Sequence, residues 1–543
     1  MERLCPQLLL SLKEYSGAKF TKDLIAGVIV AIIALPLSIA LALASGVSPE
    51  QGLYTAIVAG FLISALGGSK VQIAGPTAAF AAIVAGIVAR NGMDGLAVAT
   101  VLAGVLLILM GVLRMGTMIK FIPYTITTGF TAGIAVTILV GQLKDFFGVT
   151  FNHSPIETVE KLEEFVACIG TASGYAILVG CVALVIQIVW PRFVQRVPAS
   201  LIAVIVTSAM VKLLDLPVNT IGDLYTISGE LPKLTIPEFS YETVAAVLPD
   251  AFTIAILAAI ESLLSCVVAD EMIGSRHNSN MELVAQGVGN TASALFGGIP
   301  ATGAIARTAA NIKNGGTSPI SGMIHAVVLL LTLVFLMPYA ALIPMPCIAA
   351  ILFLVAYNMS GWRVFARVLR QSPKSDSAVL LLTFFLTVVF DLVVAIGVGL
   401  SLACLLFMKR MADVAVIEEW KYIEDDKDEQ GRYRPVPSHV MVYEITGPMF
   451  FGAADQIPHI QPGERRRVMI LRMRSVPALD ITALNSLCRL WEECRHHRIE
   501  LIFSHVNEQP MSVMKKAGFY DAVGGADYFC ANIDEALEKA AQL

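Results

Sequence analysis

Long apolar segments separated by short polar loops occupy most of the chain, from about residue 24 to residue 411. Fourteen of them can be distinguished, at roughly 24–44, 51–68, 76–90, 93–113, 121–142, 172–190, 197–215, 246–270, 281–297, 303–313, 320–340, 344–360, 376–391 and 393–411. A helix needs about 20 apolar residues to cross the hydrocarbon core of a bilayer, and most of these segments approach that length. The pattern therefore predicts an α-helical polytopic membrane protein.

Two segments are too short and too interrupted to cross a bilayer as ordinary helices. They are the third, in VQIAGPTAAFAAIVAG (71–86), and the tenth, in GGIPATGAIARTAANIKNGG (297–316). If the fourteen segments are divided into two sevens, each interrupted segment is third in its half. Because seven is odd, the second half starts on the opposite side of the membrane, so the two halves form an inverted repeat. Paired broken helices of this kind indicate the binding site of a transporter.

The pattern changes after Arg410, where short β-branched strands alternate with amphipathic helices, as in VMVYEITGPMFF (440–451) and IELIFSHV (499–506). This alternation predicts a small α/β domain outside the membrane. The predicted organisation is a cytoplasmic N-terminus (1–23), a first transmembrane repeat (24–215), a second repeat (246–411), a charged linker (412–437) and the α/β domain (438–543).

Charge and composition set the orientation and exclude several classes of function. Of the 543 residues, 56% are hydrophobic and only 15% are charged, and the net charge is -5. Lysine and arginine are more frequent in alternate loops, which predicts that both termini are cytoplasmic. We expect a multi-pass protein of the cell inner (plasma) membrane. The nine cysteines form no metal-ligand spacing, and no nucleotide fingerprint or catalytic triad order occurs. We therefore expect no cofactor, no nucleic-acid partner and no enzyme.

The two interrupted segments carry the chemistry of anion binding. A half-helix that begins near Pro76, and another that begins near residue 303, would each present free backbone N–H groups and the positive end of a helix dipole. Arg307 lies one turn inside the second half-helix. A lone buried arginine costs about 2.5–3.5 kcal/mol at this depth, so we expect a partner for it.

Glu261, near the middle of the eighth segment, is the obvious candidate for that partner, and Ser265 lies four residues later on the same helical face. One interpretation is a structural ion pair between Glu261 and Arg307. The other is that the carboxylate exchanges a proton or coordinates a cation and so couples transport to an ion gradient. The ninth segment carries a polar stripe, Glu282, Gln286 and Asn290, for which hydrogen bonding between helices is favoured over lining a cavity.

The stretch LPLSIALALASGVSPEQGLYTAIVAGFLISALGGS (35–69) resembles the signature of the SulP family of sulfate permeases and prestin-type carriers. AGPTAAF (74–80), AAIESLLS (258–265) and GIPATGAIARTAANIKNGGTSPISGMIHA (298–326) are further matches, and the C-terminal domain is similar to STAS domains. Within the family, the tenth segment is most similar to the bacterial dicarboxylate carrier DauA and its relatives.

The resemblance implies a seven-plus-seven inverted repeat with core and gate domains, assembled as a homodimer, with an anion held between the third and tenth helices. Carried over by position, the anion-binding residues are Thr77, Ala78, Ala304, Ile305, Ala306, Arg307, Thr308, Leu37 and Leu41. Glu261 and Ser265 fall where sodium-coupled bicarbonate carriers place a carboxylate and a hydroxyl around their cation. Many relatives have Gln or Glu at the position of Leu37, which weakens any proton coupling through the first helix.

In the STAS-like domain, PALDITAL (477–484) resembles a loop that is phosphorylated in soluble relatives, with Thr482 at the modified position. A helix N-cap is the favoured role of Asp480 or Thr482.

The sequence thus predicts a secondary active transporter of a small inorganic or organic anion (sulfate, bicarbonate or a C4-dicarboxylate). We expect coupling to H+ or Na+ and alternating access. The alternatives are a nucleobase permease of the same fold and an uncoupled anion channel regulated by the STAS-like domain.

Overall fold

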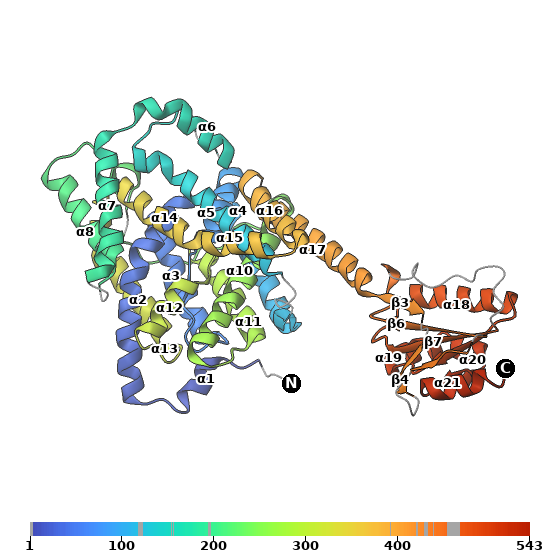
Figure 1. Cartoon of the computed structure of the whole chain (residues 1–543). Coiled ribbons are helices and arrows are strands. Elements are labelled where there is room, and N and C mark those ends of the chain that lie inside the picture. The colour runs from blue at the N-terminus through green and yellow to red at the C-terminus, as the bar shows by residue number, and fades with distance from the viewer. Residues whose placement is uncertain are drawn as a thin grey trace. The chain divides into compact units, whose positions relative to one another are not determined.

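The computed structural model describes residues 4–117, 123–153, 155, 157–193, 197–227, 229–390, 392–419, 422–427, 433–437, 439–452 and 467–543. The chain divides into two compact units, Met1–Leu400 and Ser401–Leu543. The first unit is helical and the second contains a β-sheet (Figure 1).

The helices of the first half are α1 (Gln7–Leu12), α2 (Gly17–Ala44), α3 (Pro49–Leu66), α4 (Ala78–Val112), α5 (Tyr124–Phe147), α6 (Thr158–Cys168), α7 (Gly174–Phe193) and α8 (Ala199–Leu213). The third and fourth predicted segments both lie in α4. The helix is kinked at Gly92, whose φ of 69° belongs to the left-handed region that glycine adopts readily.

The helices of the second half are α9 (Ile221–Leu224), α10 (Tyr241–Ile273), α11 (Ser279–Leu295), α12 (Ile305–Lys313), α13 (Ile320–Ala340), α14 (Met345–Ser360), α15 (Trp362–Gln371), α16 (Lys374–Val389) and α17 (Leu392–Val414). Each apolar segment of the sequence corresponds to one of these helices or to part of one. Among the described helices, eight are long and apolar enough to cross a membrane, and the others are shorter or less apolar.

Both interrupted segments begin with a two-residue strand. β1 (Ala74–Gly75) pairs antiparallel with β2 (Thr302–Gly303), so that Ala74 lies opposite Gly303 and Gly75 opposite Thr302. β1 leads into α4 and β2 leads into α12. The strands satisfy each other's backbone groups inside the membrane unit, which is how extended chain can persist there.

The helices around this strand pair pack closely. α4 packs against α10 and α11, α3 packs against α11 and α13, and α5 packs against α14 and α16. Small residues make the first of these contacts possible, because a Cβ atom added to Gly287 of α11 would meet the carbonyl oxygen of Gly104 of α4 at 2.5 Å.

The second unit is an α/β domain, as predicted. Its five-stranded sheet has the order β3 (Val416–Glu419), β6 (Val440–Thr446), β7 (Val468–Ser475), β8 (Glu500–Ser504) and β9 (Phe529–Cys530). Only β3 is antiparallel to its neighbour. Helices α18 (Ile481–His496), α19 (Glu508–Lys516) and α20 (Phe519–Val523) bury apolar residues in one core, and α21 (Ile533–Ala540) in a second. β4 (Tyr422–Lys427) and β5 (Tyr433–Pro435) form a separate pair.

Candidate anion-binding site

The starts of α4 and α12 are both free of side-chain caps. Thr77 and Ala304 occupy the N-cap positions in extended conformations. The Thr77 hydroxyl accepts no hydrogen bond from the described residues of α4, and Ala304 has no side-chain acceptor. The first N–H groups of a helix have no intrahelical partner. Two helix starts that flank one strand pair and lack caps therefore offer two sets of donors to an anion.

The residues predicted around these starts differ in exposure. Ile305 is 45% exposed and Ala306 is also exposed, whereas Ala78 is 7% exposed and Ala304 is 9% exposed. The first turn of α12 therefore presents Ile305 and Ala306 outward. A ligand that reached this turn would meet apolar side chains and backbone rather than charged groups.

Arg307 lies behind this surface. Its side chain is only 3% exposed, and Nη2 donates a hydrogen bond of 2.5 Å to the carbonyl oxygen of Pro76, just before α4. Nη1 has no hydrogen-bond partner within the described part of the chain and lies against Gly75, where an added Cβ would collide with it. Arg307 therefore joins the two interrupted segments and places a buried positive charge beside both helix starts.

The ion pair between Glu261 and Arg307 that the sequence suggested is not present among the described residues. Glu261 of α10 instead accepts a hydrogen bond of 3.0 Å from the hydroxyl of Thr77. The next residue, Ser262, lies 3.1 Å from the Thr302 hydroxyl and accepts from the Gly303 N–H at 3.0 Å. Helical spacing placed Glu261 in the correct span but could not tell which of two neighbouring polar groups its carboxylate meets.

Ser265 and Thr308 form a second contact between α10 and α12. The Ser265 hydroxyl lies 3.3 Å from that of Thr308, which accepts from the Ile73 N–H at 3.1 Å. Both side chains are at most 2% exposed. Their interactions hold the segment that enters β1. On α2, which packs beside α12, Leu41 is buried and Leu37 is partly exposed.

The polar stripe of α11 makes hydrogen bonds, as favoured, but its partners below lie in non-helical segments rather than on other helices. Glu282 accepts from the side chain of Gln72 at 2.7 Å and from the Gly68 N–H at 2.9 Å. Asn290 donates to the Ala301 carbonyl at 2.9 Å and accepts from the Ala301 N–H at 2.8 Å. These hydrogen bonds hold both segments that lead into the strand pair, residues 68–72 before β1 and Ala301 before β2.

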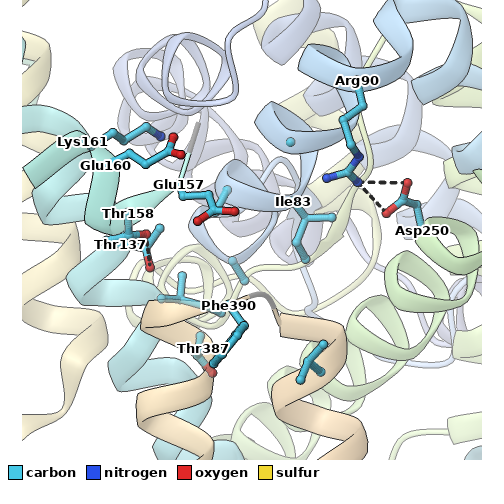
Figure 2. Close-up of a pocket in the computed structure, with 15 residues that line it drawn as sticks. Ile83, Arg90, Thr137, Glu157, Thr158, Glu160, Lys161, Asp250, Thr387 and Phe390 are labelled. Carbon is cyan, nitrogen blue, oxygen red and sulfur yellow. Dashed lines mark hydrogen bonds and ion pairs between the residues drawn. The ribbon is translucent and has the colours of Figure 1, made fainter. Parts of the chain in front are cut away.

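A cavity of about 440 Å³ extends from the first turn of α4. Along α4 it is lined by Ala79, Ala82, Ile83, Gly86 and Arg90, which share one helical face. α5, α6, α10 and the end of α16 supply the other walls, including Ile134, Thr137, Asp250 and Phe390. Figure 2 shows Arg90 and Asp250 on one side of this cavity and Glu160 and Lys161 of α6 on the opposite side.

One end of the cavity carries charge. Arg90 and Asp250 form an ion pair of 3.0 Å between α4 and α10, with side-chain exposures of 57% and 14%. On α6, burial lowers the pKa of the Lys161 ammonium. The end near Ala79 is apolar by comparison, so the charged groups lie farther from the start of α4.

Several of these contact residues were not recognised in the sequence, among them Ser262, Thr302, Gln72 and the pair Arg90–Asp250. Ser262 directly follows Glu261, and that adjacency was a usable signal. Gln72 and Arg90 contact residues more than 150 positions away in the chain, and Thr302 contacts Ser262, 40 positions away.

In the second unit, Asp480 caps α18 by accepting a hydrogen bond of 2.8 Å from the Ala483 N–H, which confirms the favoured role. Thr482 is exposed on the first turn of α18. Its phosphorylation stays a prediction.

Comparisons with known proteins identify the family. Residues 20–383 match the sulfate permease family, and residues 434–540 match the STAS domain. YvdB of Bacillus subtilis (strain 168) is 41% identical over 95% of this chain and 97% of its own length. The bicarbonate transporter BicA of Picosynechococcus is 31% identical over 87% of this chain and 86% of its own.

Solved structures share the fold. The inward-facing structure of the murine anion transporter Slc26a9 has a TM-score of 0.89 at 17% identity and covers 99% of this chain and 94% of its own. The transmembrane domain of BicA has a TM-score of 0.63 at 29% identity and covers 74% and 100%. The seven-plus-seven transmembrane fold is thereby confirmed. The chain belongs to the sulfate permease family of membrane anion transporters and carries a C-terminal STAS domain.

Proposed function

We propose that this protein is a secondary active transporter that binds one small anion between the starts of α4 and α12 and moves it by alternating access. The observation that carries the proposal is the pair of uncapped helix starts joined by Arg307. Partial positive charges of two helix dipoles and one buried guanidinium favour a bound anion at this place.

The same geometry supports sulfate, bicarbonate or a C4-dicarboxylate as substrate class. Relatives named as sulfate and bicarbonate transporters favour the first two. Backbone N–H groups recognise negative charge more than the identity of the anion, so specificity has to be measured. Uptake of one labelled anion by proteoliposomes, with a panel of competing anions, identifies the substrate. Absence of uptake for every anion tested would refute the proposal.

Coupling to H+ or Na+ would act through Glu261. Its carboxylate bonds Thr77 at the start of α4, so a proton or cation on Glu261 changes the charge next to the anion site. Glu261→Gln resembles a permanently protonated acid. That variant should exchange anions down their gradient but lose accumulation driven by a proton or sodium gradient. Full accumulation in Glu261→Gln would exclude this role, and wild-type uptake that ignores both gradients would favour an uncoupled channel.

The cavity between α4 and α5 would be the access route. In the orientation predicted from the basic loop residues, its charged end opens to the outside, and its apolar end adjoins Ala79 in the first turn of α4. Closing this route while opening the opposite side would require α4 and α10 to move against α5 and α16. A nucleobase permease, the alternative of the same fold, is disfavoured by Arg307 and by the STAS domain.

A further inference from the structure

Helix α15 is sharply amphipathic, and its 10 residues by themselves are too few to cross a bilayer. It joins α14 to α16, starts directly after Gly361 in the left-handed conformation and has the sequence WRVFARVLRQ. Positions 363, 367 and 370 are arginines, and their spacing of four and three places all three on one face. All three side chains are exposed, and among the described residues none forms an ion pair with a carboxylate.

The opposite face of α15 is packed against the membrane unit. α15 contacts α5 and α16, and the rings of Phe365 and Phe384 lie edge to face with centroids 5.3 Å apart. This packing fixes the direction in which the arginines point. The helix cannot turn its basic face inward without breaking the aromatic contact.

The border between the two faces is apolar and open. Trp362 is 52% exposed and Leu369 is 37% exposed, and helical geometry places them next to each other around the helix, between Phe365 and Arg370. The Trp362 indole N–H donates to the Tyr357 hydroxyl at 3.2 Å, and the Arg363 guanidinium lies 5.4 Å from the Trp362 ring centroid. Exposed tryptophan and leucine next to a basic stripe are typical of helices that lie at the boundary between headgroups and acyl chains.

We propose that α15 is a binding surface for anionic phospholipid headgroups, with Arg363, Arg367 and Arg370 contacting the phosphates and Trp362 and Leu369 contacting the acyl chains. An acidic soluble segment would pair with the arginines but would leave the apolar border in water. The exposed apolar border therefore favours lipid over the acidic stretch that follows α17. This inference does not depend on the transported anion or on the coupling ion.

The test uses the purified full chain in neutral detergent, titrated with phosphatidylglycerol or with phosphatidylcholine while thermal unfolding is followed. Phosphatidylglycerol should raise the unfolding temperature and phosphatidylcholine should not. In a chain with Arg363→Gln, Arg367→Gln and Arg370→Gln, the midpoint of the phosphatidylglycerol titration should rise about 100-fold, about fivefold for each arginine near an anionic surface.

A matched control removes the same charge from the second unit, through Arg489→Gln, Arg495→Gln and Arg498→Gln, which are also exposed. The control should keep the wild-type midpoint. Equal midpoints in the α15 variant and the wild type would overturn the proposal. The proposal would also be overturned if phosphatidylglycerol raised the unfolding temperature only after residues 412–543 were deleted. That result would indicate that the acidic residues after α17, rather than lipid, bind the arginines of α15.

Discussion

Arg307 offers the sharpest perturbation of the proposed site. Its guanidinium is buried and bonds the Pro76 carbonyl at 2.5 Å, so it acts on α12, which carries it, and on the segment that starts α4. A hydrogen bond from a charged donor contributes about 1.5–3 kcal/mol. Arg307→Ala removes this bond and the buried charge together. The bond to Pro76 forms with or without the anion, so the change in KM comes from the lost charge. If that charge contributes a similar amount, about 1.5–3 kcal/mol, to anion binding, the apparent KM should rise about 10- to 150-fold.

Arg307→Lys separates the two contributions. Lysine keeps the positive charge but lacks the planar pair of nitrogens with which arginine reaches Pro76 while lying against Gly75. Its KM should fall between those of the wild type and Arg307→Ala. The assay is initial uptake of the labelled anion by proteoliposomes, normalised to the amount of folded protein. A wild-type KM in Arg307→Ala, at equal protein amount, would refute the reasoning.

Three further predictions concern other parts of the chain. Thr77→Val removes the donor to Glu261 and should alter the dependence of uptake on the coupling ion, whereas Thr77→Ser should not; identical ion dependence in both variants would count against the coupling role. Deleting residues 436–543 should lower the amount of protein in the membrane but leave the order of preference among anions unchanged, because the proposed site lies in the first unit. A changed order of preference would contradict this prediction. Gly287→Leu should reduce the yield of monodisperse protein because it meets the Gly104 carbonyl, while Gly141→Leu, with open space around it, should be tolerated; equal yields would disprove the packing argument.

The transmembrane architecture could be predicted from the sequence because it depends on properties that are local in the chain. Fourteen apolar segments are distinguishable by their hydrophobicity and the polar loops between them, and the two breaks are marked by Pro76 and by the glycines and proline near residue 300. Because each half has seven segments, an odd number, the second half starts on the opposite side of the membrane and the repeat is inverted. The alternation of strands and helices after residue 438 likewise predicts the α/β domain. None of these predictions depends on which side chains are in contact.

The partners inside the site could not be predicted in the same way. Helical periodicity places Glu261 and Ser265 on one face of α10, yet the first bonds Thr77 and the second contacts Thr308. Which contact forms depends on the strand register that sets Gly75 opposite Thr302, and two-residue strands leave no periodic signal. Arg307 shows the same limit, because charge suggested a carboxylate partner while the structure gives it a backbone carbonyl.

The location of the anion is the central claim, and the protection of an introduced cysteine tests it most directly. Ala306 is exposed in the first turn of α12, so Ala306→Cys should react with an anionic, membrane-impermeant thiol reagent in the full-length chain. The unmodified chain reports the background reaction of its own cysteines. The account predicts that the transported anion slows labelling of this cysteine in a saturable way, with a midpoint near the KM for uptake. Labelling at an unchanged rate under saturating anion would contradict a binding site between α4 and α12.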